Sequence, residues 1–366
     1  MNNVPNLRFP EFQGEWEKCT LEDVINFSTT RVNSSELNKD NYVSTENMLQ
    51  DYQGIVKAKS VPEDVNVVSF SCGDILISNI RPYLKKVWKA TFNGGCSSDV
   101  FVLKANDNIE SDYLHYVIAN DKFINFVMSG AKGVKMPRGD KKQMETYSLS
   151  LPQIQEQHKI ARLLSLLDER IATQNKIIDK LQSLIKGIAQ HCIRELINGW
   201  EYVRLGDICK ITTGKLDANA QVENGQYPFF TCAERPFNIN SYAFDTEALL
   251  ISGNGANLGY INYYKGKFNA YQRTYVLDLF SVNIHYVKWA LKVLLPQRIA
   301  IEKSSSNTPY IVLSTLANLK IPIPNNSKQN HIANLMMSFE RKLSTQLALS
   351  DLYNKQKQYL LRQMFI

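Results

Sequence analysis

An internal repeat constrains this chain more than any other feature of its sequence. The segment LPQIQEQHKIARLLSLLDERIATQ (151–174) recurs in altered form as IPNNSKQNHIANLMMSFERKLSTQ (323–346), without a gap and at a constant offset of 172 residues. The aligned pairs are Pro152 and Pro324, Gln157 and Gln329, Ile160 and Ile332, Ala161 and Ala333, Leu163 and Leu335, Asp168 and Glu340, and Thr173-Gln174 with Thr345-Gln346. Self-similarity of this kind indicates two copies of one structural plan.

The segments that precede these repeats match more loosely. The corresponding pairs are 15–24 with 199–208, 73–79 with 247–253, and 112–117 with 282–287, at offsets of 184, 174 and 170. The drifting offsets place insertions and deletions in this part of each copy. Each copy is therefore predicted to be a globular part with variable loops followed by a regular helical part.

Both repeated segments are predicted to be unusually long helices that pack against each other. Apolar residues alternate at spacings of four and three, the heptad pattern of a coiled-coil seam, and segments of roughly 40 residues far exceed the mean helix of about 11–12. The alternative is two amphipathic helices on separate cores. The predicted seam consists of Ile160, Leu164, Leu167, Ile171, Gln174, Ile178, Leu181 and Ile185 in the first helix, and of Ile332, Met336, Phe339, Leu343, Gln346, Tyr353 and Leu360 in the second.

The globular parts are predicted to be mixed α/β. Runs rich in β-branched and aromatic residues, such as GDILIS, DVFVLKA and TYVLDLF, are bounded by Gly, Asn and Asp, which is typical of short strands. Residues 112–128 and 282–299 have helical patterns. The predicted organisation is a first globular domain at 1–151, a first long helix at 152–197, a second globular domain at 198–324 and a second long helix at 325–366.

Composition narrows the class of protein. The formal charge of +7 and the pI of about 8.9 are compatible with a polyanionic partner but do not establish one. Six scattered cysteines without a C-x-x-C pair, and no H-E-x-x-H, make a metal site improbable and favour reduced thiols. The N-terminus lacks the pattern of a signal peptide, and no apolar run approaches the roughly 20 residues of a membrane helix. We therefore expect a soluble, cytoplasmic protein without a metal.

Two motifs raise the alternative of a DNA methyltransferase. Asn-Thr-Pro-Tyr (307–310) resembles the tetrapeptide that holds a flipped adenine, and SGNGANLG (252–259) resembles a cofactor-binding glycine loop. However, such a glycine loop should open a helix, whereas YINYYKGKF follows here. The repeat partners of the two motifs are KMPR and SNIRPYLKK, which carry neither signature. ITTGKL (211–216) also lacks the full phosphate-loop pattern, so the chain is not expected to be an enzyme.

The same loops suit DNA contact, because Arg can fork onto guanine, Asn onto adenine, and Lys can bind phosphate. Each of these side chains taken alone could equally be an ordinary solvated group. Their recurrence on equivalent loops of both copies favours a shared DNA-binding role. The candidate residues are Asn79, Arg81, Tyr83, Lys85, Lys86, Lys132, Lys135 and Arg138 in the first copy, and Lys215, Asn254, Asn257, Gln272, Arg273, Asn307 and Tyr310 in the second.

The chain resembles the specificity subunit of type I restriction-modification systems. The resemblance is carried by PNLRFPEFQGEW, GDILISNIRPYLKK and above all LPQIQEQHKIARLLSLLDERI, together with the duplicated plan of a domain followed by a helix. It implies two target-recognition domains, each reading one half of a split, asymmetric DNA site, and an antiparallel coiled coil that separates them. The second copy departs from the family pattern at 323–332 and in its less regular seam.

The resemblance also implies partners. Two modification subunits would bind S-adenosylmethionine and methylate adenine, and restriction subunits would add ATP- and Mg²⁺-dependent translocation and cleavage, leaving this chain without catalysis or a cofactor of its own. Two alternatives remain open: a stand-alone DNA-binding regulator of the same architecture, and a coiled-coil scaffold unrelated to DNA. Co-purification with methyltransferase subunits and DNA binding in their presence would distinguish them.

Three geometric expectations follow. A helix over 153–193 would be about 60 Å long, so domains at its ends could reach major grooves one to two DNA turns apart, at about 34–36 Å per turn. Gln174 and Gln346 hold equivalent seam positions and are expected to face each other. Phe365 is expected to lie beside Trp16, which would bring the two termini together.

Overall fold

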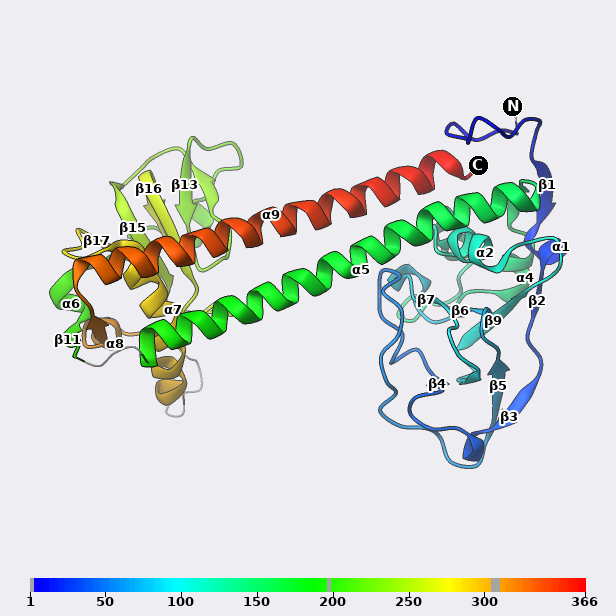
Figure 1. Ribbon diagram of the computed structural model, residues 1–366, viewed down its shortest axis with the longest axis horizontal. Coiled ribbons are helices and arrows are strands. Elements are labelled where there is room, and N and C mark those ends of the chain that lie inside the picture. The colour runs from blue at the N-terminus through cyan, green and yellow to red at the C-terminus, as the bar shows by residue number, and fades with distance from the viewer. Residues whose placement is uncertain (1–2, 196–198, 304–309) are drawn as a thin grey trace. The chain divides into compact units, whose positions relative to one another are not determined.

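The computed structural model describes residues 3–195, 199–303 and 310–366 and divides into two compact units. Unit 1 comprises Met1–Gln174 and Leu349–Ile366, and unit 2 comprises Asn175–Ala348. Each unit contains a mixed α/β globular part together with segments of two long helices, α5 (Ile154–Gln190) and α9 (Asn326–Met364) (Figure 1). The predicted fold class, mixed α/β with long repeated helices, is therefore confirmed.

The globular part of unit 1 contains two four-stranded sheets. One has the order β2 (Ile25–Phe27), β9 (Val100–Ala105), β6 (Ile75–Ser78), β7 (Val87–Lys89), and the other β3 (Arg31–Asn33), β5 (Asn66–Phe70), β8 (Gly94–Cys96), β4 (Tyr42–Val43). The short helices are α1 (Leu21–Val24), α2 (Ser111–Ile118), α3 (Asp121–Ser129) and α4 (Lys141–Glu145). The helical pattern at 112–128 is thus two helices, with Asn120 capping the second. All four β6 residues are buried, which explains the apolar run ILIS.

The globular part of unit 2 replaces the two sheets with one of six strands. Its order is β12 (Lys210–Thr213), β17 (Thr274–Asp278), β15 (Phe244–Ser252), β16 (Ile261–Ala270), β13 (Tyr227–Phe230), β14 (Phe237–Ile239). The helices are α6 (Leu205–Ile208), α7 (Ile284–Lys303) and α8 (Leu313–Ala317). β15 corresponds to β6 in the repeat and is equally buried over its last five residues. Equivalent core strands therefore end at equivalent points in the two units.

A repeated proline and glutamine join each globular part to its long helix. In unit 1, β1 (Glu17–Thr20) pairs with β10 (Ser148–Leu151) before Pro152, and in unit 2, β11 (Glu201–Arg204) pairs with β18 (Lys320–Ile323) before Pro324. Gln157 Nε2 donates to the Pro152 carbonyl at 2.9 Å, and its Oε1 accepts from Glu110 N at 2.8 Å. Gln329 makes the same two bonds, to Pro324 O at 2.9 Å and from Asn283 N at 3.0 Å. Buried glutamines thus fix both joints.

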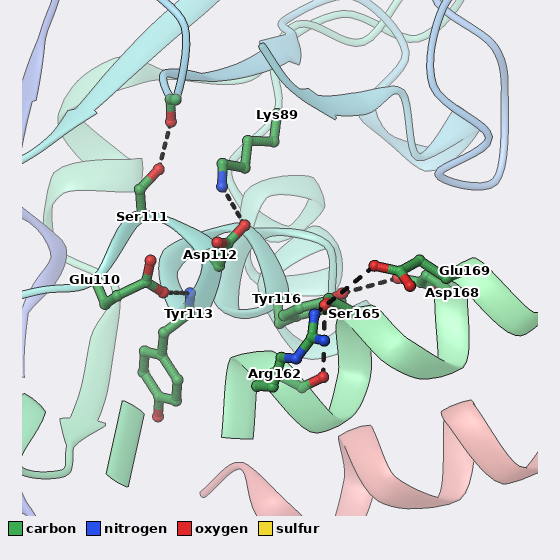
Figure 2. Close-up of polar contacts among 11 residues, drawn as sticks. Lys89, Glu110, Ser111, Asp112, Tyr113, Tyr116, Arg162, Ser165, Asp168 and Glu169 are labelled. Atoms are coloured by element: carbon green, nitrogen blue, oxygen red, sulfur yellow. Dashed lines mark hydrogen bonds and ion pairs between the residues drawn. The ribbon is translucent and has the colours of Figure 1, made fainter. Parts of the chain in front are cut away.

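A repeated acidic residue then ties each globular part to the side of its helix. Figure 2 shows Tyr116 of α2 donating its hydroxyl hydrogen to Asp168 of α5, at 2.9 Å. In unit 2 the equivalent Glu340 of α9 accepts from Lys288 at 2.7 Å and from Lys292 at 3.1 Å. The alignment of Asp168 with Glu340 in the repeat therefore reflects one structural task, which holds the globular part at a fixed place along the helix.

The segments of α5 and α9 run antiparallel within each unit. In unit 1, Ile160 and Leu164 share a core with Met364 and Phe365, and Asp168 pairs with Lys357 at 2.6 Å. In unit 2, Leu181 and Ile185 share a core with Ile332, Met336, Phe339 and Leu343. The seam positions in α5 are the buried ones, apart from half-buried Ile171. Gln174 is also buried but belongs to a different unit from Gln346, so their contact stays a prediction.

Both ends of the chain belong to unit 1. Leu7 N donates to the Gln363 carbonyl of α9 at 3.0 Å, and Trp16 shares a hydrophobic core with Phe365. The terminal segments therefore lie together, as expected, and Trp16 and Phe365 belong to the same core. Further, all six cysteines are free thiols, and none of the helices described is long and apolar enough to cross a membrane.

We predict that a circularly permuted chain folds. Joining Ile366 to residue 1 with a short Gly/Ser linker and opening the chain at 196–198 keeps every strand pair and both long helices intact, and short loops add little closure entropy. The melting temperature should stay within a few degrees of the parent, measured by thermal unfolding. A permutant opened inside β6, which is fully buried, is the control and should fail to fold.

His115 gives unit 1 a dependence on pH. The pKa of His115 is lowered from 6.5 to about 4, chiefly by burial and also by the charge of Lys357, whereas Asp168 opposes the shift. Its Nδ1 is buried and has no hydrogen-bond partner among the described residues. The neighbouring Lys89 lowers and Asp112 raises the same pKa. The folded unit therefore keeps this ring neutral where the unfolded chain would protonate it.

Unit 1 should lose stability as the pH falls from about 6.5 to about 4. Between these values the unfolded chain binds a proton at His115 that the folded chain excludes, so the stability present above pH 6.5 is lost, by about 2–3 kcal/mol in total. Urea unfolding at a series of pH values measures it. His115→Gln should flatten this part of the profile.

Candidate nucleic-acid interface

Three segments meet where the core strand of unit 1 ends. Asn79, directly after β6, donates its N–H to the Asp99 carbonyl at 2.9 Å and accepts from Gly139 N at 2.8 Å. Arg81 N donates to the Pro137 carbonyl at 2.7 Å. The loops 79–86 and 130–139, both rich in cations, are thereby held together; we call this arrangement the three-segment junction.

The same junction forms in unit 2 at the repeat-equivalent residues. Gly253, directly after β15, donates its N–H to the Arg273 carbonyl at 2.8 Å and accepts from Ile311 N at 2.8 Å. An isolated bridge joins Asn254 to Tyr310, as one joins Ile80 to Arg138 in unit 1. The candidate residues of both copies thus lie on loops fixed by one backbone pattern, although their side chains differ.

Several cations predicted to contact DNA in unit 1 already have partners inside the unit. These pairs are Lys85 with Asp121 at 2.8 Å, Lys86 with the Thr45 carbonyl at 2.5 Å, Lys132 with Asp140 at 3.0 Å, and Arg138 with Asp99 at 3.4 Å. Asn79 is buried, with 9% of its surface exposed. Burial lowers the pKa of Lys86, and the nearby charge of Arg81 lowers it further. These residues therefore hold the loops in place through internal contacts, in addition to contributing positive charge.

Three candidate residues in unit 1 project freely instead. Arg81, Tyr83 and Lys135 are exposed, and within the ranges described their side chains have no hydrogen-bond or ion-pair partner. Tyr83 has 48% of its surface exposed. A guanidinium, a phenol and an ammonium group are therefore available to a ligand at this junction.

In unit 2 the candidate amides are tied together by a residue that sequence reasoning missed. The Cys232 thiol donates to Asn254 Oδ1 at 3.0 Å, and Asn257 Nδ2 donates to the Cys232 carbonyl at 3.0 Å. Gln272 Nε2 donates to Asp217 at 2.7 Å. No motif in the sequence marks Cys232, because its role depends on a loop brought close only by folding.

The remaining candidates of unit 2 are exposed. Lys215 and Arg273 have no side-chain partner within the part of the chain that the structure describes, and Tyr310 has 54% of its surface exposed. Asn307, together with most of Asn-Thr-Pro-Tyr, lies outside the described residues. Unit 2 therefore also presents cations and an aromatic ring beside its junction.

The structure accounts for the glycine loop after β15 and for ITTGKL without a nucleotide site. The loop after β15 leads into the strand β16 rather than into a helix, as expected from YINYYKGKF. In ITTGKL, a Cβ at Gly214 would lie 1.8 Å from the Ala270 carbonyl oxygen, so glycine is required there by the close approach of two chain segments. Neither segment has the arrangement by which a helix N-terminus holds a nucleotide phosphate.

Comparison with known families agrees with the internal repeat. A family model described as the type I restriction modification DNA specificity domain matches residues 13–183 and again residues 197–349. The two matches cover most of the chain. The chain therefore belongs to this family and carries two copies of its domain.

Individual relatives match over parts of the chain. It is 45% identical over 134 residues to the specificity subunit of the type I restriction enzyme EcoDI from Escherichia coli, which covers 37% of this chain and 30% of that protein. It is 25% identical over 257 residues to the MjaIX specificity subunit from Methanocaldococcus jannaschii, which covers 60% of each. The matches thus span less than two thirds of these relatives.

Solved structures show the same fold. The S subunit of a type I restriction-modification system from M. genitalium superposes with a TM-score of 0.70 at 17% identity, over 99% of both chains. A chain from a study of complex assembly and conformational transition in a type I R-M system superposes with a TM-score of 0.58 at 19% identity, over 94% of this chain and 96% of that one. At these identities the likeness establishes the architecture.

Proposed function

We propose that this chain is the sequence-specific DNA-recognition subunit of a type I restriction-modification system, with each unit reading one half of a bipartite site. The observation that carries the proposal is the three-segment junction, which occurs at equivalent positions of two family-matched domains. At both junctions, exposed cationic and aromatic side chains stand on loops fixed by backbone hydrogen bonds. Phosphate contacts from such cations give affinity, and side chains that reach base edges give sequence selectivity.

The two junctions carry different side chains, so the two half-sites should differ in sequence. Unit 1 presents Arg81, Tyr83 and Lys135, whereas unit 2 presents Lys215, Arg273 and Tyr310 beside a cluster of amides. The same backbone with a different set of donors and acceptors selects a different set of bases. An asymmetric site is therefore the expected target, and the long helices are proposed to set the gap between its halves.

We further propose that the long helices dock two modification subunits. These helices carry exposed apolar side chains in both units, which a docked partner would cover. They are Leu166, Leu352 and Tyr359 in unit 1, and Ile177, Leu184 and Leu347 in unit 2. Methylation with S-adenosylmethionine, and ATP- and Mg²⁺-dependent translocation and cleavage by restriction subunits, would belong to these partners, leaving this chain non-catalytic. A cytoplasmic location follows from the proposed target, cellular DNA.

Co-purification and DNA binding test this proposal. Tagged chain co-expressed with the modification subunits should retain them through purification, and the complex should bind one DNA sequence far more tightly than random DNA, with an affinity that falls as salt rises. Specific DNA binding by the chain alone, without retained subunits, would favour the stand-alone regulator. A complex that binds no DNA would favour the scaffold.

A further inference from the structure

The backbone at Arg81 is unusual for an arginine. Its φ is +50° and its ψ is 60°, a left-handed conformation in which the Cβ of an L-residue crowds the following carbonyl. The conformation is imposed on both sides, since Arg81 N donates to Pro137 O at 2.7 Å and Arg81 O accepts from Leu84 N at 2.9 Å. The next residue, Pro82, is buried and starts a short 3₁₀ turn at Pro82–Leu84. The position of the Arg81 Cα is therefore fixed.

The repeat shows which residue this backbone position favours. Arg81 aligns with Gly255, two residues after the ends of the equivalent core segments ILISN and LLISG. Gly255 is also left-handed, with φ +78°, and glycine adopts this conformation without steric cost. A Cβ at Gly255 would meet nothing within 4 Å, so a side chain there would point into open space. Unit 1 thus keeps an arginine where glycine would suit the backbone better.

Arg81 and Lys135 are candidate cations of unit 1 without a partner among the described residues, and the backbone of Arg81 is hydrogen-bonded into the junction itself. Lys85, Lys86, Lys132 and Arg138 all have partners inside the unit, whereas Arg81 has none among the residues described. Strain at an exposed residue that is hydrogen-bonded into the candidate interface motivates the hypothesis that its side chain has a function there. Guanidinium can form two parallel hydrogen bonds to the O6 and N7 atoms of guanine, which is the commonest specific contact in the major groove.

We propose that Arg81 is a specificity-determining residue that reads one guanine, on either strand, in the half-site of unit 1. This inference rests on the proposed function and names one base contact within it. A phosphate contact by the same side chain is the competing outcome. Guanine recognition needs the planar guanidinium group, whereas attraction to phosphate needs only a positive charge. Replacing Arg81 by Lys, which keeps the charge and removes the planar group, therefore distinguishes the two outcomes.

Methylome sequencing of cells that express the chain with its modification partner provides the test. The parent should methylate a bipartite motif with a G·C pair at a fixed position in one half. Arg81→Gly and Arg81→Lys should both relax that one position and leave the rest of the motif intact. Methylation rates on matched oligonucleotides should show discrimination against other base pairs at that position falling by roughly 5- to 150-fold. Arg81→Gly should also melt at or above the temperature of the parent, since it restores the residue type found in unit 2.

Leu279→Gly is the matched control. Leu279 is another left-handed residue, with φ +52° and 69% of its surface exposed, but it follows β17, whereas Arg273 of the unit 2 junction precedes that strand. It should raise the melting temperature without changing the motif. Four results would each overturn the inference while leaving the proposed function standing. Two concern the strength and pattern of methylation: an unchanged motif in Arg81→Gly, or uniformly weaker methylation in Arg81→Gly with normal activity in Arg81→Lys. The others are relaxation at a position other than a G·C pair and a lower melting temperature of Arg81→Gly. A parent complex that methylates no defined motif would overturn both.

Discussion

Inserting seven residues into both long helices is expected to widen the gap between the two half-sites by about three base pairs. One heptad adds about 10.5 Å to a helix, and DNA rises about 3.4 Å per base pair. A heptad keeps the seam in register, whereas an insertion of another length would rotate the apolar face. The insertions belong after Gln174 and after Gln346, equivalent positions at or near the boundaries between the units. Methylome sequencing of the variant reads the new gap directly.

The insertion has two controls. The same seven residues placed in α5 alone should abolish or greatly weaken specific methylation, because the seam partners of α9 would then be displaced. Glycine and serine in place of helix formers should give no defined gap, since a flexible segment sets no distance. Unchanged half-sites with an unchanged gap in the double insertion would show that the helices do not set the spacing.

Arg8→Ala is expected to destabilise unit 1 by about 3–5 kcal/mol, because it leaves a carboxylate buried without its ion-pair partner. Glu156, in the first turn of α5, has only 1% of its side chain exposed, and Arg8 contacts both of its oxygens at 2.8 Å. Arg8 also donates to the Gly14 carbonyl at 2.6 Å. The N-terminal segment, whose Leu7 contacts α9, is thereby fastened to the start of α5.

Lys57→Ala is the matched control for Arg8→Ala. Lys57 pairs with Asp40 at 2.8 Å, but both side chains are more than half exposed, so the loss should be under about 1 kcal/mol. Arg8→Met combined with Glu156→Met removes both charges and should recover much of the lost stability. Urea unfolding measures all three. If Arg8→Ala lost no more stability than Lys57→Ala, the buried pair would not be what fastens the N-terminal segment.

The two long helices, α5 and α9, could be predicted closely from the sequence. Long helices have a period that can be counted, so the buried faces of α5 and α9 follow from residues such as Ile160, Leu164 and Met336. The repeat added the equivalence of the two globular parts. It also identified Gln157 and Gln329 as a pair, although only the structure shows that both fasten a helix to the turn before it.

The interface was harder to predict, because sequence shows which side chains are charged but not which are already paired. Lys85, Lys86, Lys132 and Arg138 became partners of nearby acceptors once the loops folded, and Arg81 did not. The contribution of Cys232 was invisible for the same reason. The different sheet arrangements of the two globular parts could not be predicted from the sequence either, since strand pairing depends on contacts between residues distant in sequence.

Methylome sequencing of cells that express this chain with its modification partner, compared with cells that lack the chain, tests the central claim most directly. If each unit reads its own half-site, a single new motif should appear, made of two unlike half-sites separated by a gap of fixed length and unread sequence. Substitutions beside the unit 1 junction should alter one half only, and substitutions beside the unit 2 junction the other. A contiguous motif, a symmetric motif, or no motif that depends on this chain would contradict the claim that each unit reads its own half of the site.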